Sequence, residues 1–134
     1  MKQVFADTFF FFALLNNRDE AHSRALEFSR GFYGEIVTTS WVIMELADGM
    51  AGTVFLRRSF LQFWNSIRSS SSFKLIPFSQ RLFEEGLQLF EQRQDKEWTL
   101  TDCISFAVMS ELRLQDALTG DKHFEQAGFS CLLK

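Results

Sequence analysis

Short and long apolar runs alternate along the chain, and polar or turn-forming residues separate them. The short runs predict strands at residues 2–6, 35–38, 73–78, 114–119 and 129–132. Between them, apolar residues spaced three or four apart predict helices. Strands that alternate with helices form a parallel sheet with helices on both faces. The pattern therefore predicts an α/β fold, a three-layer α/β/α arrangement around a five-stranded parallel sheet, as a single domain over residues 1–134.

Capping residues predict where the helices begin and end. Asn17 and Glu20 have the spacing of a capping box, which would open a helix that Gly31 ends. Thr39 or Ser40 would cap another helix. The remaining helices are expected at residues 8–15 and 54–67, from Ser79 to about 93, after the segment 98–102, and from Asp121 to about 126.

Phenylalanine is unusually frequent, with 17 among 134 residues. In the helix that Ser79 caps, we expect Leu82, Phe83, Leu87 and Phe90 to face inward. So many rings cannot all be central, and we expect some to line a subunit or partner interface. The alternative is an aromatic-rich core with a few exposed rings.

The overall charge does not favour nucleic-acid binding. A net charge of −3 and a pI near 5.4 provide no basic field for phosphates. A local basic patch or bound cations would have to supply the attraction.

Cysteine usage and the N-terminus indicate a cytoplasmic protein. Cys103 and Cys131 are too few for a disulfide framework and lack zinc-ligand spacing, so we expect free thiols in a reducing compartment. Asp7 interrupts the N-terminal apolar run, and no small-residue cleavage site follows, so a signal peptide is not predicted. No apolar run approaches the ~20 residues that cross a bilayer.

Four acidic residues occupy related places in this pattern. Asp7 follows the first strand, Glu45 lies in the helix after the second, Asp102 starts a helix, and Asp121 follows the fourth strand. Because parallel strands end at one edge of a sheet, all four side chains could meet there. Each also has an ordinary alternative: Asp7, Asp102 and Asp121 could be helix caps, and Glu45 a solvated helix residue. Asp48 is close enough to Glu45 to be an outer member.

Clustered carboxylates repel one another unless a cation is present. The sequence offers no buried lysine or arginine close to each of the four acids. Oxygen ligands suit Mg²⁺ or Mn²⁺, which can activate water and hold a phosphodiester. We therefore expect Mg²⁺ (or Mn²⁺) as the cofactor, and the cation would also attract an anionic polymer.

At these positions the chain resembles the PIN-domain proteins, especially the VapC-like toxin ribonucleases. The resemblance rests on Phe5-Ala-Asp7-Thr8, on residues 39–46 around Glu45, on residues 100–106 around Asp102, and on residues 118–124 with Asp121. These motifs follow one another in order over essentially the whole chain.

The resemblance implies a PIN-like fold and a Mg²⁺- or Mn²⁺-dependent endoribonuclease. Asp7, Glu45, Asp102 and Asp121 would be the acidic quartet that holds the metal, and Thr8, Thr119 and Thr101 would support it. It also implies RNA as the substrate, an antitoxin protein as a partner, and a homodimer.

We hypothesise that water activated by the cation attacks phosphorus in line and that a 3′-hydroxyl leaves. Possible phosphate contacts are Lys122, His123, Arg93 and Lys96, although for each one taken singly a solvated face is the favoured alternative.

Other functions are possible for this pattern. The main alternative is a noncatalytic PIN-like module that binds RNA or protein. A receiver domain needs an acid after the third strand, where residues 76–78 read Ile-Pro-Phe. A haloacid-dehalogenase-type phosphatase needs one two residues after Asp7, where Phe9 stands. Both of these are disfavoured.

Overall fold

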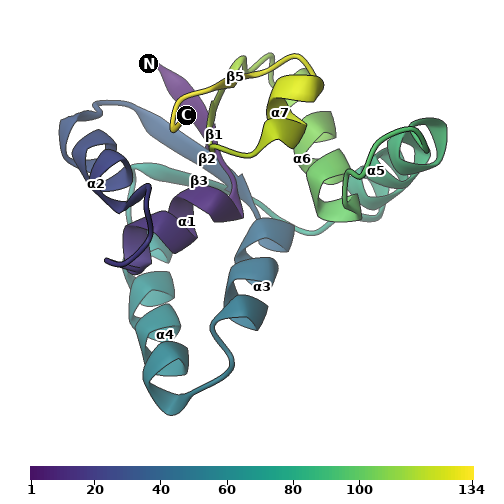
Figure 1. The fold of residues 1–134 in the computed structure, drawn as a ribbon. Helices are drawn as coiled ribbons and strands as arrows, with labels where there is room; N and C mark the ends of the chain where they lie inside the picture. The colour runs from purple at the N-terminus through teal and green to yellow at the C-terminus, as the bar shows by residue number, and fades with distance from the viewer.

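Five parallel strands form one sheet in the computed structural model, which describes residues 1–134 (Figure 1). They are β1 (Gln3–Ala6), β2 (Glu35–Thr39), β3 (Phe73–Ile76), β4 (Asp116–Leu118) and β5 (Ser130–Cys131), in the order β3-β2-β1-β4-β5. Every neighbouring pair is parallel. The predicted sheet is confirmed. Because the chain extends the sheet on one side of β1 and then on the other, a topological switch point lies between β1 and β4, where ligands bind in open α/β sheets.

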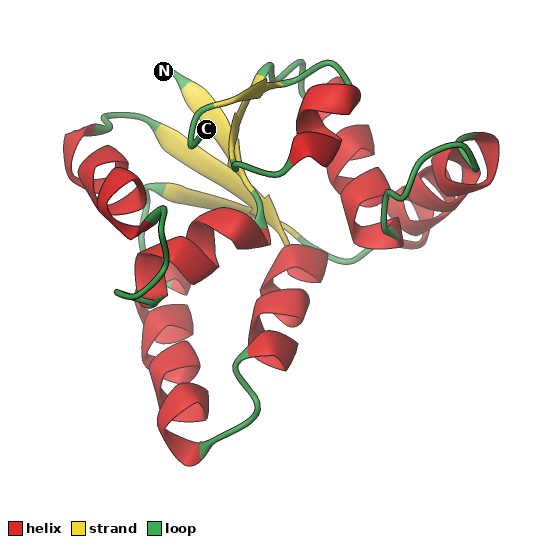
Figure 2. Ribbon diagram, in the orientation of Figure 1, coloured by secondary structure: helices red, strands yellow, loops and turns green.

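Helices connect and flank the strands, as the red ribbons of Figure 2 show. They are α1 (Thr8–Leu15), α2 (His22–Gly31), α3 (Ser40–Gly49), α4 (Val54–Arg68), α5 (Gln80–Gln92), α6 (Leu100–Glu111) and α7 (Lys122–Gln126). In Figure 1, α3 and α4 extend away from the sheet to a shared loop at the bottom, and α5 and α6 lie together at the right.

Aromatic rings join the sheet to the helices around it. Phe5 of β1 stacks on Phe124 of α7 at 6.2 Å between ring centroids, and Phe106 of α6 meets Phe124 edge-on at 4.9 Å. In α1, Phe11 lies 5.4 Å from Phe63 of α4. Phe5, Phe11 and Phe124 are fully buried, so a phenylalanine-rich core fixes the helices against the strands that carry the candidate site.

The start of the second helix differs from the prediction. Asn17 and Glu20 form no capping box, and α2 begins only after Ala21, which has no side-chain cap. The Asp19 carboxylate accepts from the Ala21 N–H at 2.8 Å, and Asn16 closes the preceding turn in the same way. Asn and Asp side chains bond readily to N–H groups two residues ahead, and here these local turns replace the first turn of helix.

The three C-terminal strands are shorter than predicted. β3 ends at Ile76, where the predicted strand continued to residue 78, because Pro77 has no N–H to donate to the sheet. β4 and β5 keep only the residues that pair with their neighbours.

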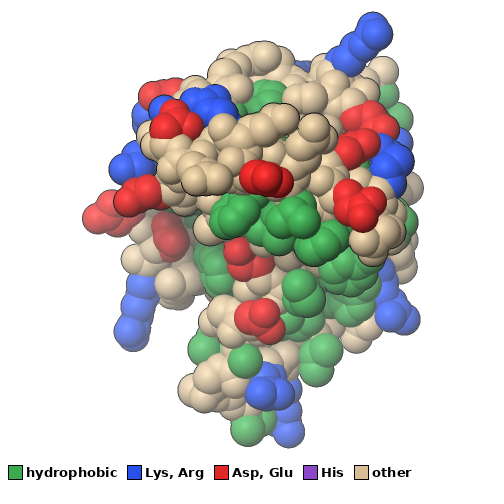
Figure 3. All heavy atoms as spheres, turned by 90° about the vertical axis from the view of Figure 1, so that its right-hand side faces the viewer, with side chains coloured by type: hydrophobic (Ala, Val, Ile, Leu, Met, Phe, Trp, Pro, Cys, Tyr) green, Lys and Arg blue, Asp and Glu red, His purple; other side chains and the backbone are tan.

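The apolar stripe of α5 is wider than the surface that covers it. Leu82 is buried as predicted, but the inward placement of Leu87 and Phe90 is wrong, since these side chains are 41% and 46% exposed. α5 packs mainly on α6, and that contact covers only one side of it. Figure 3, seen from the side of α5 and α6, shows apolar side chains in a band with acidic side chains above, within and below it.

Both cysteines are free, with Cys103 buried and Cys131 partly covered. Burial raises the pKa of the Cys103 thiol to about 11, which makes it unreactive at neutral pH. None of the helices combines the length and the apolar character that a membrane crossing requires.

Candidate metal centre

Asp7 stands between β1 and α1, and its side chain is buried. It occupies the N-cap position of α1, yet its carboxylate forms no capping bond to the helix. Instead, Oδ2 accepts from the Thr119 hydroxyl at 3.2 Å, and Oδ1 lies 3.3 Å from the Thr8 hydroxyl. The carboxylate therefore lies between the hydroxyls of Thr8, the first residue of α1, and of Thr119, which follows β4.

Two threonines connect Asp7 to further acids. The Thr8 hydroxyl donates to Glu45 Oε1 at 2.6 Å, which brings α3 against the start of α1. The Thr119 hydroxyl donates to Asp7 and accepts from the Asp121 N–H at 3.0 Å. Thr119 is fully buried where β4 ends, beside β1 in the sheet.

His123 connects the remaining two acids. Its backbone N–H donates to Asp121 Oδ1 at 2.9 Å, and its ring Nδ1 lies 2.9 Å from Asp102 Oδ2. Asp102 also completes a capping box with Thr99, so the capping alternative is correct for Asp102 without excluding a second role. Asp121 likewise caps α7. Thr101, expected to support the site, makes no hydrogen bond to these groups.

These contacts form one hydrogen-bonded chain through four acids that are distant in sequence. Its members run, in spatial order, Glu45, Thr8, Asp7, Thr119, Asp121, His123 and Asp102.

The electrostatic consequence is concentrated on Asp7. Burial, followed by the neighbouring carboxylates of Asp102, Glu45 and Asp121, raises the pKa of Asp7 from 3.8 to about 7. No lysine or arginine forms an ion pair with any of the four acids. A cation from outside the chain would favour the ionised form of Asp7.

The basic residues considered for phosphate binding have different surroundings. Arg93 pairs with Asp95 at 3.0 Å and lies over the Trp98 ring at 5.0 Å, so its guanidinium already has partners. Lys122 is exposed and Lys96 partly exposed. For Lys122, Lys96 and Arg93, a role in phosphate binding stays a prediction.

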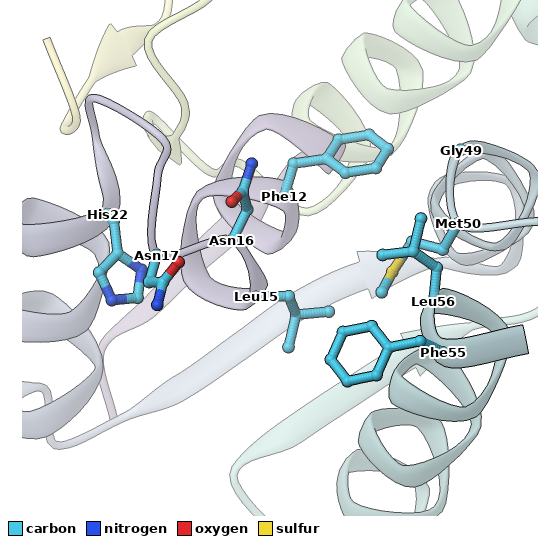
Figure 4. Close-up of a pocket in the computed structure, with 9 residues that line it drawn as sticks. All are labelled: Phe12, Leu15, Asn16, Asn17, His22, Gly49, Met50, Phe55 and Leu56. Atoms are coloured by element: carbon cyan, nitrogen blue, oxygen red, sulfur yellow. The ribbon is translucent and has the colours of Figure 1, made fainter. Parts of the chain in front are cut away.

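A cavity of 460 Å³ lies at the other end of α1 and contains none of the four acids (Figure 4). His22 points toward it, with Nδ1 2.8 Å from the Ala13 carbonyl oxygen. Its lining comes from α1, α3, α4, the start of α2 and the loops that follow α1 and α3: Phe12, Leu15, Asn16, Asn17, His22, Gly49, Met50, Phe55 and Leu56.

Comparison with known protein families shows to which family the chain belongs. Residues 4–130 match the family model described as "PIN domain". The chain belongs to the PIN-domain family. Among curated protein sequences, none matches it significantly.

Several solved structures show the same fold. VapC20 of Mycobacterium tuberculosis, a toxin that cleaves the sarcin–ricin loop, superimposes with a TM-score of 0.85 at 25% identity, covering 94% of this chain and 95% of VapC20. FitAcB from Neisseria gonorrhoeae gives a TM-score of 0.69 at 16% identity over 96% and 95% of the two chains. A toxin–antitoxin complex from Klebsiella pneumoniae gives 0.58 at 22% identity over 89% and 87%.

The donor set of this PIN domain fits a hard divalent cation. The oxygens Asp102 Oδ1, Asp121 Oδ2 and Glu45 Oε2 accept no hydrogen bond from the chain. Asp102, Asp121 and His123 can each offer a ligand atom within 4.8 Å of the others. Carboxylate oxygens around a buried acid without a counter-ion are suitable ligands for Mg²⁺ or Mn²⁺.

Sequence reasoning missed the contact between His123 and Asp102. The sequence suggested a phosphate contact for His123, because it follows Asp121 at the presumed pocket. The two partners are 21 residues apart, and neither the capping pattern nor the apolar pattern links α6 to α7 at this point. The packing of Phe106 on Phe124 holds the two helices together and brings them into contact.

Proposed function

We propose that this PIN-domain protein is a Mg²⁺- or Mn²⁺-dependent endoribonuclease and the toxin of a toxin–antitoxin pair. The observation that carries the proposal is the hydrogen-bonded chain that joins Asp7, Glu45, Asp102 and Asp121 with no lysine or arginine among them. A cluster of this kind is unfavourable in a protein that binds no cation. The similarity to VapC20, an RNA-cleaving toxin, supports RNA as the substrate class.

Asp7, Glu45, Asp102 and Asp121 would hold the cation. When bound, it would activate water and stabilise negative charge on the phosphate being cleaved. Thr119 would fix the Asp7 carboxylate from the sheet side, and Thr8 would hold Glu45 in place across the start of α1. Lys122 is exposed and follows Asp121 directly in the sequence. It would be the first candidate to contact an RNA phosphate.

The proposal is tested by cleavage of RNA with Mg²⁺ or Mn²⁺ and with EDTA. Asp7→Asn and Asp102→Asn are each expected to lower the cleavage rate at least about 100-fold, because each removes a charged ligand. Asp116→Asn is the matched control: Asp116 begins β4 at the opposite edge of the sheet and forms only a surface pair with Lys2 at 3.7 Å.

Two results would contradict the enzyme proposal. One is cleavage that persists in EDTA, and the other is equal cleavage by wild type and Asp7→Asn. If RNA binds but is not cut by any variant, the noncatalytic RNA- or protein-binding module is favoured.

The partner that we propose is an antitoxin protein. The similarity to structures such as the Klebsiella toxin–antitoxin complex supports this, as do the exposed apolar side chains of the α3–α4 hairpin, where Phe55 is 76% exposed. Exposed Leu87 and Phe90 on α5 support a homodimer in addition.

The antitoxin proposal is tested in the genome and by co-expression. A small neighbouring reading frame whose product co-purifies with this protein and suppresses its RNA cleavage is the expected result. If no such product exists and expression of this protein alone does not slow growth, the toxin role is contradicted, whereas the nuclease activity is judged separately by the cleavage assay.

A further inference from the structure

His123 lies between two of the acids and contacts both. Its ring Nδ1 is 2.9 Å from Asp102 Oδ2 and 3.6 Å from Asp121 Oδ1. Its backbone N–H donates to the same Asp121 oxygen at 2.9 Å. The side chain is only 17% exposed, and the adjacent Phe124 is fully buried and fixes α7 against the core.

In the carboxylates of Asp102 and Asp121, one oxygen has hydrogen-bond partners in the chain and the other has none. Asp102 Oδ2 accepts from the Thr99 N–H at 3.1 Å and faces the His123 ring, whereas Oδ1 has no partner in the chain. Asp121 Oδ1 accepts from the His123 N–H, and Oδ2 has no partner. One oxygen of each acid is therefore left for a ligand from outside.

The chemistry of the pair determines which ring nitrogen carries the proton. An ionised carboxylate can only accept hydrogen bonds, so Nδ1 of His123 must donate to Asp102. In the neutral form of the ring, Nε2 is the acceptor, and Nε2 has no partner in the chain.

We propose that His123 is a positioning residue of the metal centre, which acts by fixing the rotation of the Asp102 carboxylate. The inference rests on the proposed metal-dependent function. A carboxylate held at one oxygen by both the Thr99 N–H and the His123 ring presents its other oxygen in a defined direction, which reduces the entropy lost when a cation binds. Partners of this kind account for about 10- to 100-fold in metal affinity.

The competing role for His123 is direct ligation of the cation through Nε2. Substitutions distinguish the two roles by position, because the amide nitrogen of Asn stands near the place of Nδ1, whereas that of Gln stands near Nε2. The backbone N–H that holds Asp121 is kept in every variant.

The experiment measures Mn²⁺ binding to the full-length chain by isothermal titration calorimetry, without RNA. His123→Ala is expected to weaken binding about 10- to 100-fold, and His123→Asn to stay within about 3-fold of wild type. His123→Gln is expected to resemble His123→Ala. His22→Ala is the matched control, because His22, the other histidine, bonds to the Ala13 carbonyl away from the acids and should bind Mn²⁺ as wild type does.

Circular dichroism melts in EDTA establish that each variant is folded, and if His123→Ala unfolds, the Asn and Gln variants carry the test. Wild-type affinity in His123→Ala, or rescue by Gln and not by Asn, would overturn the positioning role. If wild type and Asp7→Asn both fail to bind Mn²⁺, the proposed function itself fails. Mn²⁺ binding that is lost in Asp7→Asn but unchanged in His123→Ala would overturn only this inference.

Discussion

Asp7 is the residue whose burial most needs an explanation, because a carboxylate without a counter-ion is unfavourable in a protein interior. The side-chain groups nearest to its carboxylate oxygens are the hydroxyls of Thr8 and Thr119 and not cations. The raised pKa, near 7, indicates that the metal-free site holds its negative charge weakly at neutral pH. Cation binding and ionisation of Asp7 should therefore be coupled.

This coupling predicts a pH dependence of stability in EDTA. The pKa of Asp7 is 3.8 in the unfolded chain and about 7 in the folded one, so the folded state binds more protons between these values. The stabilisation of the folded state by protonation of Asp7 is fully present below pH 3.8 and is lost as the pH rises through 7. Each unit of difference between the two pKa values corresponds to about 1.4 kcal/mol in the free energy of unfolding.

Asp7→Asn should thus be more stable than wild type in EDTA at pH 8 and should lose this advantage toward pH 4. Urea unfolding across the pH range measures the difference, and Mg²⁺ should stabilise only the wild type. A difference between the two proteins that does not change with pH would contradict the raised pKa.

Ser105 provides a second prediction for a single residue. Its hydroxyl is fully buried in α6 without a hydrogen-bond partner. Ser105→Ala removes an unsatisfied polar group and should raise the free energy of unfolding by about 1 kcal/mol.

Thr38→Val is the comparison for Ser105, because the buried Thr38 hydroxyl donates to the Ala6 carbonyl at 2.9 Å. Losing that bond should lower stability by about 1 kcal/mol. Denaturant unfolding of both variants checks the pair, and a destabilised Ser105→Ala would show that the hydroxyl has a partner in solution.

At the scale of elements, acidic residues at the starts of α6 and α7 cap these helices and also form part of the site. Thr99 and Asp102 close a capping box at the start of α6, and Asp121 caps α7. The same carboxylates face His123. A helix start is therefore a place where one acidic side chain can stabilise the fold and also serve a ligand.

The position of α6 depends on its close contact with α5. A Cβ atom added at Gly86 would lie 2.3 Å from Ile104 Cγ1 and 3.1 Å from the Ile104 backbone. Gly86→Ala should therefore destabilise the protein by about 1–3 kcal/mol, although alanine favours helices.

Gly31→Ala is the control for this substitution, since a Cβ atom there meets nothing within 4 Å. Thermal unfolding of the two variants tests the contact. A melting temperature of Gly86→Ala at or above that of Gly31→Ala would mean that α5 and α6 pack less closely than they do here.

At the scale of the whole molecule, the topology brings the acids together. β1 and β4 are neighbours although about 110 residues separate Ala6 from Leu118, so the ends of both strands meet at the switch point. The alternation of strands and helices was enough to predict this sheet, because a parallel sheet follows from that order.

Other features depend on contacts that no local pattern contains. Leu87 and Phe90 were predicted to face inward from helical spacing, but spacing cannot show that only one side of α5 is covered. The ring contact between His123 and Asp102 likewise arises from the packing of α7 on α6. The sequence predicted well which segments form helices and strands. It predicted poorly how much of the surface of each element other elements cover.

The central claim is that acids from four separate segments form one cation site. Anomalous diffraction from crystals of the full-length protein grown with Mn²⁺ tests it most directly. The account predicts an anomalous peak coordinated by Asp7 and by carboxylates from α3, from α6 and from the segment after β4, which Asp7→Asn abolishes. A well-ordered crystal at saturating Mn²⁺ with no peak between these residues, or with a peak only elsewhere, would contradict it.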